Sequence, residues 1–151
     1  MTRRRALAAG LLSLAATVVA VPGLARAAAG PAVTVWKAAS CECCEGWVRH
    51  MREAGFGVTV RVVDDVDPVK RANGVPDALA SCHTALVDGY VVEGHVPASD
   101  VKRLLSERPQ AKGLSAPGMP QDAPGMDMGT GRPYEVVLFG GAGGDRLFAR
   151  H

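Results

Sequence analysis

The chain has 151 residues, of which 48% are hydrophobic and 21% are charged. This length is enough for one domain with a modest hydrophobic core. Lysine and arginine number 17 against 15 aspartate and glutamate residues, and a net charge of only +2 argues against the basic surface that nucleic-acid binding needs.

The N-terminus has the three parts of an export signal. Residues 2–5 read T-R-R-R, residues 7–21 are an apolar run, and residues 25–27 form an A-x-A cleavage site. The apolar run is too short for a stable membrane span, with a tethered N-terminal helix as the alternative. The opening T-R-R-x-A-L approximates a twin-arginine pattern, so the twin-arginine and general secretory (Sec) routes are both open. We predict that residues 1–27 are removed and that the protein is periplasmic, without a membrane span.

Removal of the signal also changes the charge of the protein. Its four arginines take the basic residues from 17 to 13 against 15 acidic ones, so the mature chain carries 13 − 15 = −2. No basic stripe remains that would attract nucleic acid.

The mature chain begins with a predicted strand, a helix and a second strand. Residues 33–37 (VTVWK) are rich in β-branched and aromatic residues and predict the first strand. Apolar residues recur at helical spacing over residues 47–51, which predicts a helix that ends at Gly55 or Gly57. Residues 58–65 alternate between apolar and polar and predict the second strand.

A short helix, a hairpin and a last helix complete the predicted domain. The short helix begins near the Asp-Pro pair at 67–68. Residues 83–94 hold two apolar runs separated by the Asp-Gly pair at 88–89, a strong hairpin signal. The last helix is capped by Ser99 or starts at Pro97. The resulting order β-α-β-α-β-β-α is that of a single thioredoxin-like α/β domain, which is the fold we predict.

The C-terminal part of the chain shows little periodicity. Residues 113–133 are rich in Gly, Pro and Met and predict an irregular loop that belongs to the domain 28–139. Residues 140–151 begin with a glycine-rich run and predict a flexible tail.

Three of the four cysteines, Cys41, Cys43 and Cys44, lie where the first strand gives way to the first helix. A helix N-terminus favours thiolate over thiol. Cys82 comes 38 residues after Cys44, just before the third strand. In a thioredoxin-like sheet the loop entering that strand lies beside the first strand–helix turn. We therefore predict that all four sulfur atoms converge in one tertiary site.

Three chemistries could use such a cluster. Oxidoreduction would use the C-x-x-C spacing of Cys41 and Cys44, although Cys43 would compete in thiol exchange. Structural disulfides are common in exported proteins and would pair one of the three with Cys82, because adjacent cysteines bond each other only with strain. Soft-metal binding would use all four residues, because packed thiolates suit Cu(I) or Zn(II). We favour metal binding and keep the other two as alternatives.

Five further side chains are candidate auxiliary ligands. Met119, Met126 and Met128 lie in the irregular loop, and their thioethers would select Cu(I) over zinc. His83 and His95 lie near the two ends of the hairpin, and imidazole also suits copper. The alternatives are incidental methionines in a flexible segment and hydrogen-bonded structural histidines.

Several segments of the chain resemble one protein family. They are CECCEGWVRHMREAGF from Cys41, GVPDALASCHTALVDGYVVEGHVPASDVKRLL from Gly74, and the later APGMP, PGMDMG and YEVVLF. Together they are similar to the CopG-like family of exported bacterial copper-resistance proteins. The resemblance covers residues 33–139 and implies a thioredoxin-like fold that binds copper through Cys41, Cys43, Cys44 and Cys82.

The resemblance also implies a function. The protein is expected to be a periplasmic copper-binding protein of copper resistance that holds Cu(I), more than one ion per chain. Interconversion of Cu(I) and Cu(II) is a further role that the resemblance implies. A copper oxidoreductase is therefore kept as an alternative to the favoured function, a copper-binding protein. The expected partners are copper ions and other periplasmic copper-handling proteins. The leading alternative is a periplasmic thiol–disulfide oxidoreductase that uses Cys41 and Cys44, and a structural or docking domain is the third.

Overall fold

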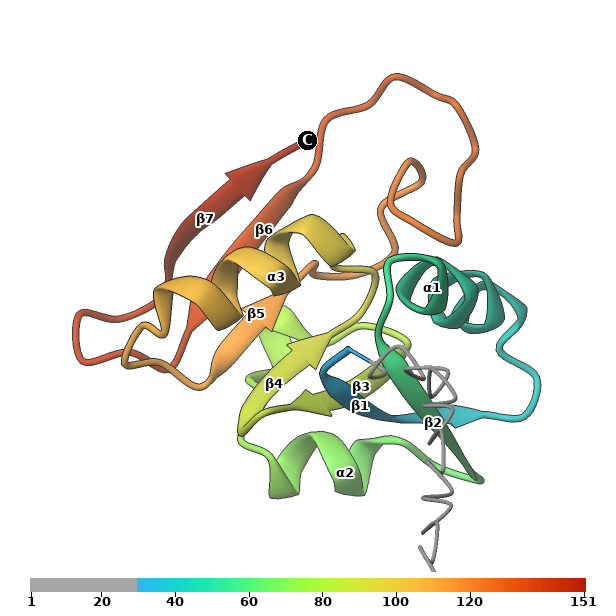
Figure 1. The fold of residues 1–151 in the computed structure, drawn as a ribbon, viewed down its shortest axis with the longest axis horizontal. Coiled ribbons are helices and arrows are strands. Elements are labelled where there is room, and N and C mark those ends of the chain that lie inside the picture. Colours follow the sequence, from blue (N-terminus) through green and yellow to red (C-terminus); the bar gives the residue numbers. More distant parts are fainter. Residues whose placement is uncertain (1–29) are drawn as a thin grey trace, which may run out of the picture.

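The computed structural model describes residues 30–151, which form a seven-stranded mixed sheet with three α-helices and one 3-10 helix (Figure 1). In chain order the elements are β1 (Ala32–Ala38), α1 (Glu42–Glu53), β2 (Gly57–Val63), α2 (Asp67–Ala72), η1 (Asp77–Leu79), β3 (His83–Val87), β4 (Tyr90–Glu93), α3 (Ala98–Glu107), β5 (Gly113–Ser115), β6 (Glu135–Phe139) and β7 (Arg146–Arg150). The predicted signal, residues 1–27, lies outside the described residues. No helix in the described part of the chain is long and apolar enough to cross a membrane.

The sheet has the strand order β2-β1-β3-β4-β5-β6-β7. Strand β1 runs parallel to β2 and antiparallel to β3, which pairs antiparallel with β4. Strand β5 is parallel to β4, and β6 and β7 follow as antiparallel neighbours. Helices α1 and α3 lie on one face of the sheet and α2 lies on the other (Figure 1). The mixed α/β class is confirmed, and the sheet has three strands more than predicted.

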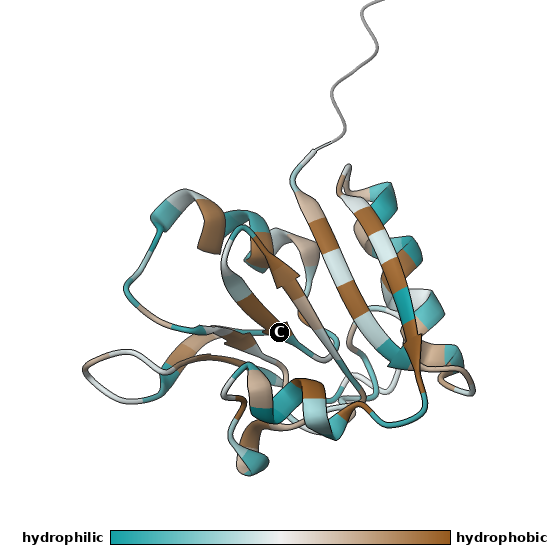
Figure 2. Cartoon of the chain, turned by 90° about the horizontal axis from the view of Figure 1, so that it is seen from below, coloured by the Kyte–Doolittle hydropathy of each residue, from teal (hydrophilic) through white to brown (hydrophobic). Residues whose placement is uncertain are grey.

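The main hydrophobic core lies between the sheet and the helices α1 and α3. It includes Val33 and Val35 of β1, Trp47 of α1 and Leu104 of α3, all of them buried. Alternate residues of a strand point to the same face, so every second residue of β1 enters this core, and Figure 2 shows the hydrophobic colouring gathered mainly in the strands. Each large apolar side chain buried here contributes about 1.5–3 kcal/mol, which holds α1 and its cysteines against the sheet.

The predicted hairpin is confirmed by β3 and β4. Val87 pairs with Tyr90 across a two-residue turn in which Asp88 has φ 47° and Gly89 has φ 85°. Two consecutive residues with positive φ match the right-handed twist of the strands, and the Asp-Gly pair tolerates that conformation. The hairpin places Cys82 just before one strand and His95 shortly after the other.

The C-terminal part of the chain differs from its prediction. The predicted flexible tail is wrong, because residues 146–150 form β7 and pair with β6. The glycines that suggested disorder instead close the turn before it, with φ 70° at Gly140 and 80° at Gly144. Strand β5 is only three residues long, and a side chain at Gly113 would collide with the Val91 carbonyl. A strand this short pairs with its neighbour because glycine lets the two backbones approach closely, and it has no periodic pattern of apolar residues.

Candidate metal centre

The N-terminus of α1 carries three of the four cysteines. Cys41 is the capping residue before the helix, and Cys43 and Cys44 lie in its first turn. A disulfide joins Cys41 to Cys44, whose Cα atoms are 5.4 Å apart, and Cys43 keeps its free thiol. Residues three apart lie on the same side of a helix, so the C-x-x-C spacing allows this bond. The alternative of a disulfide to Cys82 is not what the structure shows.

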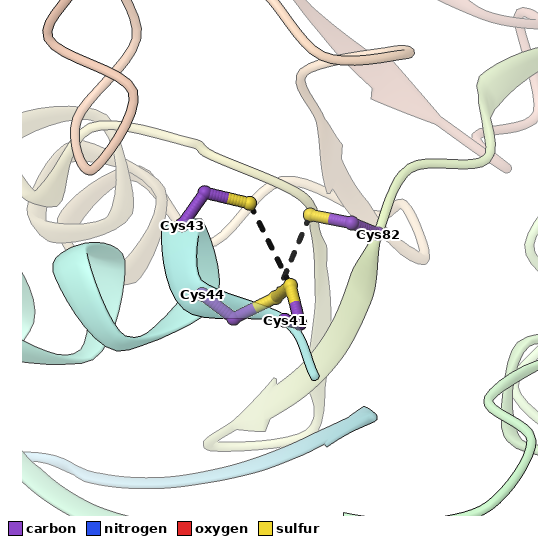
Figure 3. A group of neighbouring side chains, drawn as sticks. All are labelled: Cys41, Cys43, Cys44 and Cys82. Carbon is purple, nitrogen blue, oxygen red and sulfur yellow. Dashed lines mark hydrogen bonds between the residues drawn. A yellow bond between two sulfur atoms is a disulfide. The ribbon is translucent and has the colours of Figure 1, made fainter. Parts of the chain in front are cut away.

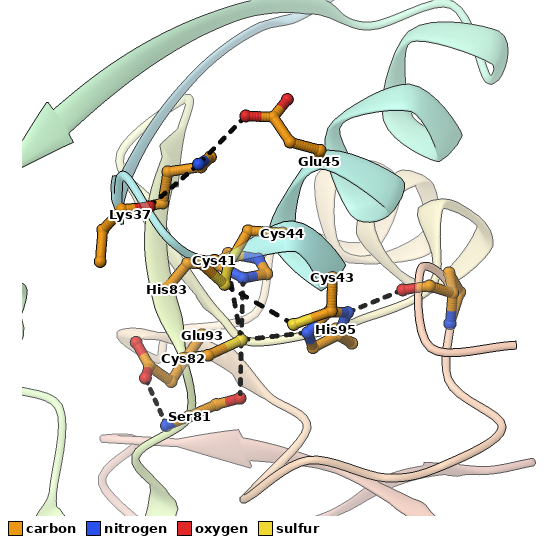
Figure 4. The surroundings of a disulfide bond; sticks show 12 residues. Lys37, Cys41, Cys43, Cys44, Glu45, Ser81, Cys82, His83, Glu93 and His95 are labelled. Atoms are coloured by element: carbon orange, nitrogen blue, oxygen red, sulfur yellow. Dashed lines mark hydrogen bonds and ion pairs between the residues drawn. A yellow bond between two sulfur atoms is a disulfide. The ribbon is translucent and has the colours of Figure 1, made fainter. Parts of the chain in front are cut away.

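The strand register brings Cys82 to the helix. Strand β3 pairs antiparallel with β1 and sets His83 opposite Lys37. The residue before β3 therefore lies beside the segment that links β1 to α1. Lys37 is itself buried, and its ammonium lies 3.0 Å from the Glu45 carboxylate of α1. This ion pair ties the first turn of the helix to the same end of the sheet (Figure 4).

The four sulfur atoms converge as predicted. The Cys82 sulfur is 3.7 Å from that of Cys44, and the Cys43 sulfur is 3.6 Å from that of Cys41 (Figure 3). All four sulfur atoms lie within 4.8 Å of one another. Cys44 is buried, whereas the other three are partly exposed, so the cluster can be reached from solvent.

Two histidines extend the cluster on the Cys82 side. Nε2 of His95 lies 3.0 Å from the Cys82 sulfur, and Nδ1 of His83 lies 3.4 Å from it. Nδ1 of His95 lies 2.8 Å from the carbonyl oxygen of Pro124, which can only accept a hydrogen bond. His95 Nδ1 therefore carries the proton, and Nε2 presents its lone pair to the Cys82 thiol.

Burial sets the protonation of these groups. Burial, together with the charge of the nearby Cys43 sulfur, raises the pKa of the Cys82 thiol to about 11. Burial also lowers the pKa of His95, and it holds the pKa of His83 well below its usual value. At neutral pH Cys82 keeps its proton and both imidazoles are neutral, the form in which histidine binds a metal.

A buried ion pair supports the Cys82 segment. Glu93 of β4 is fully buried, and its carboxylate lies 2.6 Å from Nζ of Lys70 on α2. It also accepts hydrogen bonds from the Thr84 hydroxyl and from the backbone N–H of Ser81, both at 2.7 Å. Burial raises the pKa of the Glu93 carboxyl, while the bonds from Lys70 and Thr84 oppose that shift. The network fixes the backbone next to Cys82 (Figure 4).

The loop between β5 and β6 lies against the first half of α1 (Figure 1). A side-chain carbon at Gly46 would lie 2.7 Å from Cα of Gly125, so only glycine permits this approach. Among the predicted auxiliary ligands of this loop, Met126 is partly buried, whereas Met119 is 53% and Met128 is 59% exposed. The structure therefore brings the loop to the helix and leaves two of its thioethers in solvent.

The donor atoms form two overlapping groups. One consists of the four cysteine sulfurs, and the other of Cys82, His83 and His95. Thiolate and imidazole donors suit copper and zinc. The nitrogen of His83 that faces the Cys82 sulfur is Nδ1, and its Nε2 is buried without a hydrogen-bond partner within the described residues. The disulfide withholds Cys41 and Cys44 as thiolates, so the reduced chain offers the larger donor set.

The chain has clear relatives among solved structures. Form 2 of "copper resistance protein CopG" is 41% identical, with a TM-score of 0.75, and the match covers 80% of this chain and 98% of that one. Form 1 is 42% identical, with a TM-score of 0.73 and coverage of 80% and 96%. The chain belongs to the CopG family. This confirms the resemblance seen in the sequence and relates the chain to proteins of copper resistance.

A family model described as "protein of unknown function, DUF411" also matches, over residues 79–126. That segment includes Cys82, His83 and His95 but not the three cysteines at the start of α1. No curated protein matches the chain.

Proposed function

We propose that this chain is a periplasmic copper-binding protein of copper resistance. In its reduced state it holds Cu(I) on Cys41, Cys43, Cys44 and Cys82. Cu(I) accepts few ligands and shares bridging thiolates, so four sulfur atoms can serve more than one ion. The observation that carries the proposal is the convergence of the four sulfur atoms within 4.8 Å in a member of the CopG family. The signal pattern in residues 1–27 supports the location.

The scaffold of the site is a thioredoxin-like unit that runs from β1 to α3. Its support is the strand order β2-β1-β3-β4, in which β1 and β2 are parallel and the following two pairings are antiparallel. Strands β5 to β7 extend this unit at one edge. The loop between β5 and β6 then closes the side of the site next to α1.

The auxiliary ligands have separate tasks in this proposal. Nδ1 of His83 and Nε2 of His95 complete the coordination of an ion held by Cys82, because both rings are neutral and these two nitrogen atoms lie close to its sulfur. Met119, Met126 and Met128 supply weak thioether contacts during copper entry and exit, and the two exposed ones are accessible to other periplasmic copper-handling proteins.

The cluster also carries the electrons for interconversion of the two copper states. Oxidation of the Cys41 and Cys44 thiols to the disulfide releases two electrons and two protons. The two electrons reduce two Cu(II) ions to Cu(I), and the reverse reaction regenerates the thiols. The Cys41–Cys44 disulfide supports this step, because it is the oxidised form of the same pair of thiols.

Anaerobic titration of the reduced, mature protein with Cu(I) tests the proposal. We expect more than one tightly held copper ion per chain, with ultraviolet thiolate-to-copper charge-transfer absorption that grows until the sites are full. Four thiols shared by bridging exceed what one Cu(I) ion needs. A single tightly bound Zn(II) ion that Cu(I) does not displace would contradict it.

A periplasmic thiol–disulfide oxidoreductase is the second candidate function. The observation that favours it is the disulfide between Cys41 and Cys44 at a helix N-terminus, where a leaving thiolate is stabilised. Such an enzyme would reduce insulin disulfides in the presence of dithiothreitol and would lose that activity in Cys41→Ser. Insulin reduction without copper binding would favour this function over the first.

A further inference from the structure

The Cys41–Cys44 disulfide has a free thiol at each end. The Cys82 sulfur lies 3.7 Å from that of Cys44, and the Cys43 sulfur lies 3.6 Å from that of Cys41. Thiol–disulfide exchange proceeds by attack of a thiolate on one sulfur and release of the other. We propose that Cys82 exchanges with this disulfide at Cys44, so that the protein interconverts between a Cys41–Cys44 form and a Cys44–Cys82 form.

The exchange is balanced within the chain. The Cys82 thiol passes its proton to Nε2 of His95, and its sulfur attacks the sulfur of Cys44. The Cys44–Cys82 bond forms as the Cys41–Cys44 bond breaks, and the electron pair of the broken bond stays on Cys41. The proton on His95 then neutralises the Cys41 thiolate. No electron enters or leaves, so the step needs no external oxidant or reductant.

His95 is placed to accept the proton. Its Nδ1 proton is committed to the Pro124 carbonyl, so the lone pair of Nε2 faces the Cys82 sulfur at 3.0 Å. The Cys82 sulfur is also within 3.7 Å of the Cys44 sulfur that it attacks. A nucleophile of this kind is activated by a base in hydrogen-bond contact, which is in turn oriented by a third group. Cys82, His95 and Pro124 have that arrangement.

The two ends of the disulfide are not equivalent. Attack by Cys82 releases Cys41, which is partly exposed and caps α1, where the helix dipole stabilises a thiolate. Attack by Cys43 at the other end would release Cys44, which is fully buried. A leaving thiolate of lower pKa departs faster, so the exchange runs at the Cys82 end.

The exchange changes which thiols are free. In the Cys41–Cys44 form the free thiols are Cys43 and Cys82, which come from different parts of the sheet and helix. In the Cys44–Cys82 form they are Cys41 and Cys43, which lie together at the N-terminus of α1 and are partly exposed. The second form therefore presents two accessible thiols at one helix end, and the buried sulfur of Cys44 stays bonded.

Disulfide mapping of the metal-free, oxidised mature protein tests this inference. The protein is incubated with iodoacetamide at neutral pH, quenched with acid, digested without reduction and analysed by mass spectrometry. Alkylation of released Cys41 is irreversible, so we expect a growing population in which Cys41 is alkylated and the peptide containing Cys44 is linked to the peptide containing Cys82. In Cys82→Ser we expect Cys41 to stay protected. Cys41 alkylation at the parental rate in Cys82→Ser, or no Cys44–Cys82 link in the parent, overturns the inference.

Two further arms keep the test decisive. His95→Gln should slow formation of the Cys44–Cys82 link by at least about tenfold, since general bases contribute about 10²–10⁴-fold. His50→Gln, which changes a histidine on α1 outside the cluster, should leave the rate unchanged. If Cys82→Ser does not fold, Cys41→Ser replaces it. Mild oxidation should then yield Cys44–Cys82, and a predominant Cys43–Cys82 bond overturns the inference. All arms are free of copper, so the outcome is independent of the proposed copper binding.

Discussion

Cys82 joins the two halves of the cysteine cluster. It contacts the sulfur of Cys44 on one side and the ring nitrogens of His83 and His95 on the other. It therefore belongs to both groups of donor atoms. Its backbone neighbour Ser81 is held by the buried carboxylate of Glu93, so the position of its sulfur is fixed by the core rather than by a mobile loop.

Substitution of Cys82 should weaken copper binding without unfolding the protein. We expect Cys82→Ser to lower the number of Cu(I) ions bound or to weaken their affinity by at least about tenfold, because even residues that only orient a ligand are worth about 10–100-fold. The free energy of unfolding should change by no more than about 1 kcal/mol, because the side chain is partly exposed and similar in size. Competition with a Cu(I) chelator and urea denaturation measure the two effects. Parental stoichiometry and affinity would show that Cys82 is not a ligand.

Individual site residues differed in how well the sequence revealed them. The cysteines could be predicted because clustered thiols are rare and chemically specific, and a distant fourth cysteine indicates a tertiary site. Glu93 and Lys70 could not, because an isolated glutamate or lysine is normally a surface residue. The one sequence feature that could have indicated Glu93 is its position directly after the apolar run of a predicted hairpin strand. The role of Pro124 depends on its backbone carbonyl, which no side-chain pattern reports.

At the scale of elements, His50 links two helices. Its Nε2 on α1 accepts a hydrogen bond of 3.0 Å from the backbone N–H of Ala98, the first residue of α3. The first N–H groups of a helix have no partner within the helix. An imidazole that caps them must be neutral, and burial lowers the pKa of His50 accordingly.

This contact should make stability depend on pH. The unfolded chain protonates His50 at its ordinary pKa near 6.5, whereas the folded chain resists protonation until lower pH. The contribution is therefore complete above pH 6.5 and is lost as the pH falls below that value. Urea denaturation of metal-free protein at pH 7.5 and 5.5 should show a smaller loss in His50→Gln than in the parent, with stabilities within about 1 kcal/mol of each other at pH 7.5. Equal losses in both proteins would rule out this role of His50.

The loop between β5 and β6 should affect copper transfer more than copper content. The triple variant Met119→Leu, Met126→Leu, Met128→Leu keeps apolar volume but removes the soft ligands. We expect the parental number of Cu(I) ions and a roughly fivefold slower transfer to a chelator, because a contact of about 1 kcal/mol changes a rate by that factor. Stopped-flow absorption measures the transfer.

Met51→Leu is the matched control for that experiment. Met51 is a buried core residue of α1, so the same chemical change leaves the loop intact. Transfer at the parental rate in the triple variant, or equal slowing in both variants, would show that the loop thioethers do not take part.

Elements were predictable where local pattern and tertiary role agree. Strand β1 alternates, α1 has an apolar stripe, and the turn at Asp88 and Gly89 needs positive φ. Strands β5 and β7 could not be predicted, because their sequences carry no such local pattern. A three-residue strand has no measurable period, and the exposed edge strand β7 is defined by its pairing with β6 rather than by its own residues.

At the scale of the whole molecule, the C-terminal strands are part of one structure. Phe148 of β7 packs against the main core, and the guanidinium of Arg103 on α3 lies 3.7 Å from the centre of its ring. Leu147, its neighbour on the same strand, is 51% exposed. The two residues therefore provide a matched pair for testing whether β7 is docked.

Unfolding of the N-terminal half should respond to this distant strand. The two tryptophans, Trp36 and Trp47, lie in β1 and α1, so their fluorescence reports on the other end of the chain. We expect Phe148→Ala to lower the free energy of unfolding seen by fluorescence by about 2 kcal/mol, and Leu147→Ala to change it by less than about 0.5 kcal/mol. An unchanged fluorescence transition in Phe148→Ala would mean that the C-terminal strands unfold separately.

The sequence spacing of the site gives its parts an order of assembly. Cys41 and Cys44 are only three residues apart, so in an unfolded chain that meets an oxidant their bond can close within a single turn of helix. Cys82 and the Pro124 carbonyl that orients His95 join the cluster only when distant parts of the chain have packed together. The disulfide can therefore form before the rest of the site is assembled.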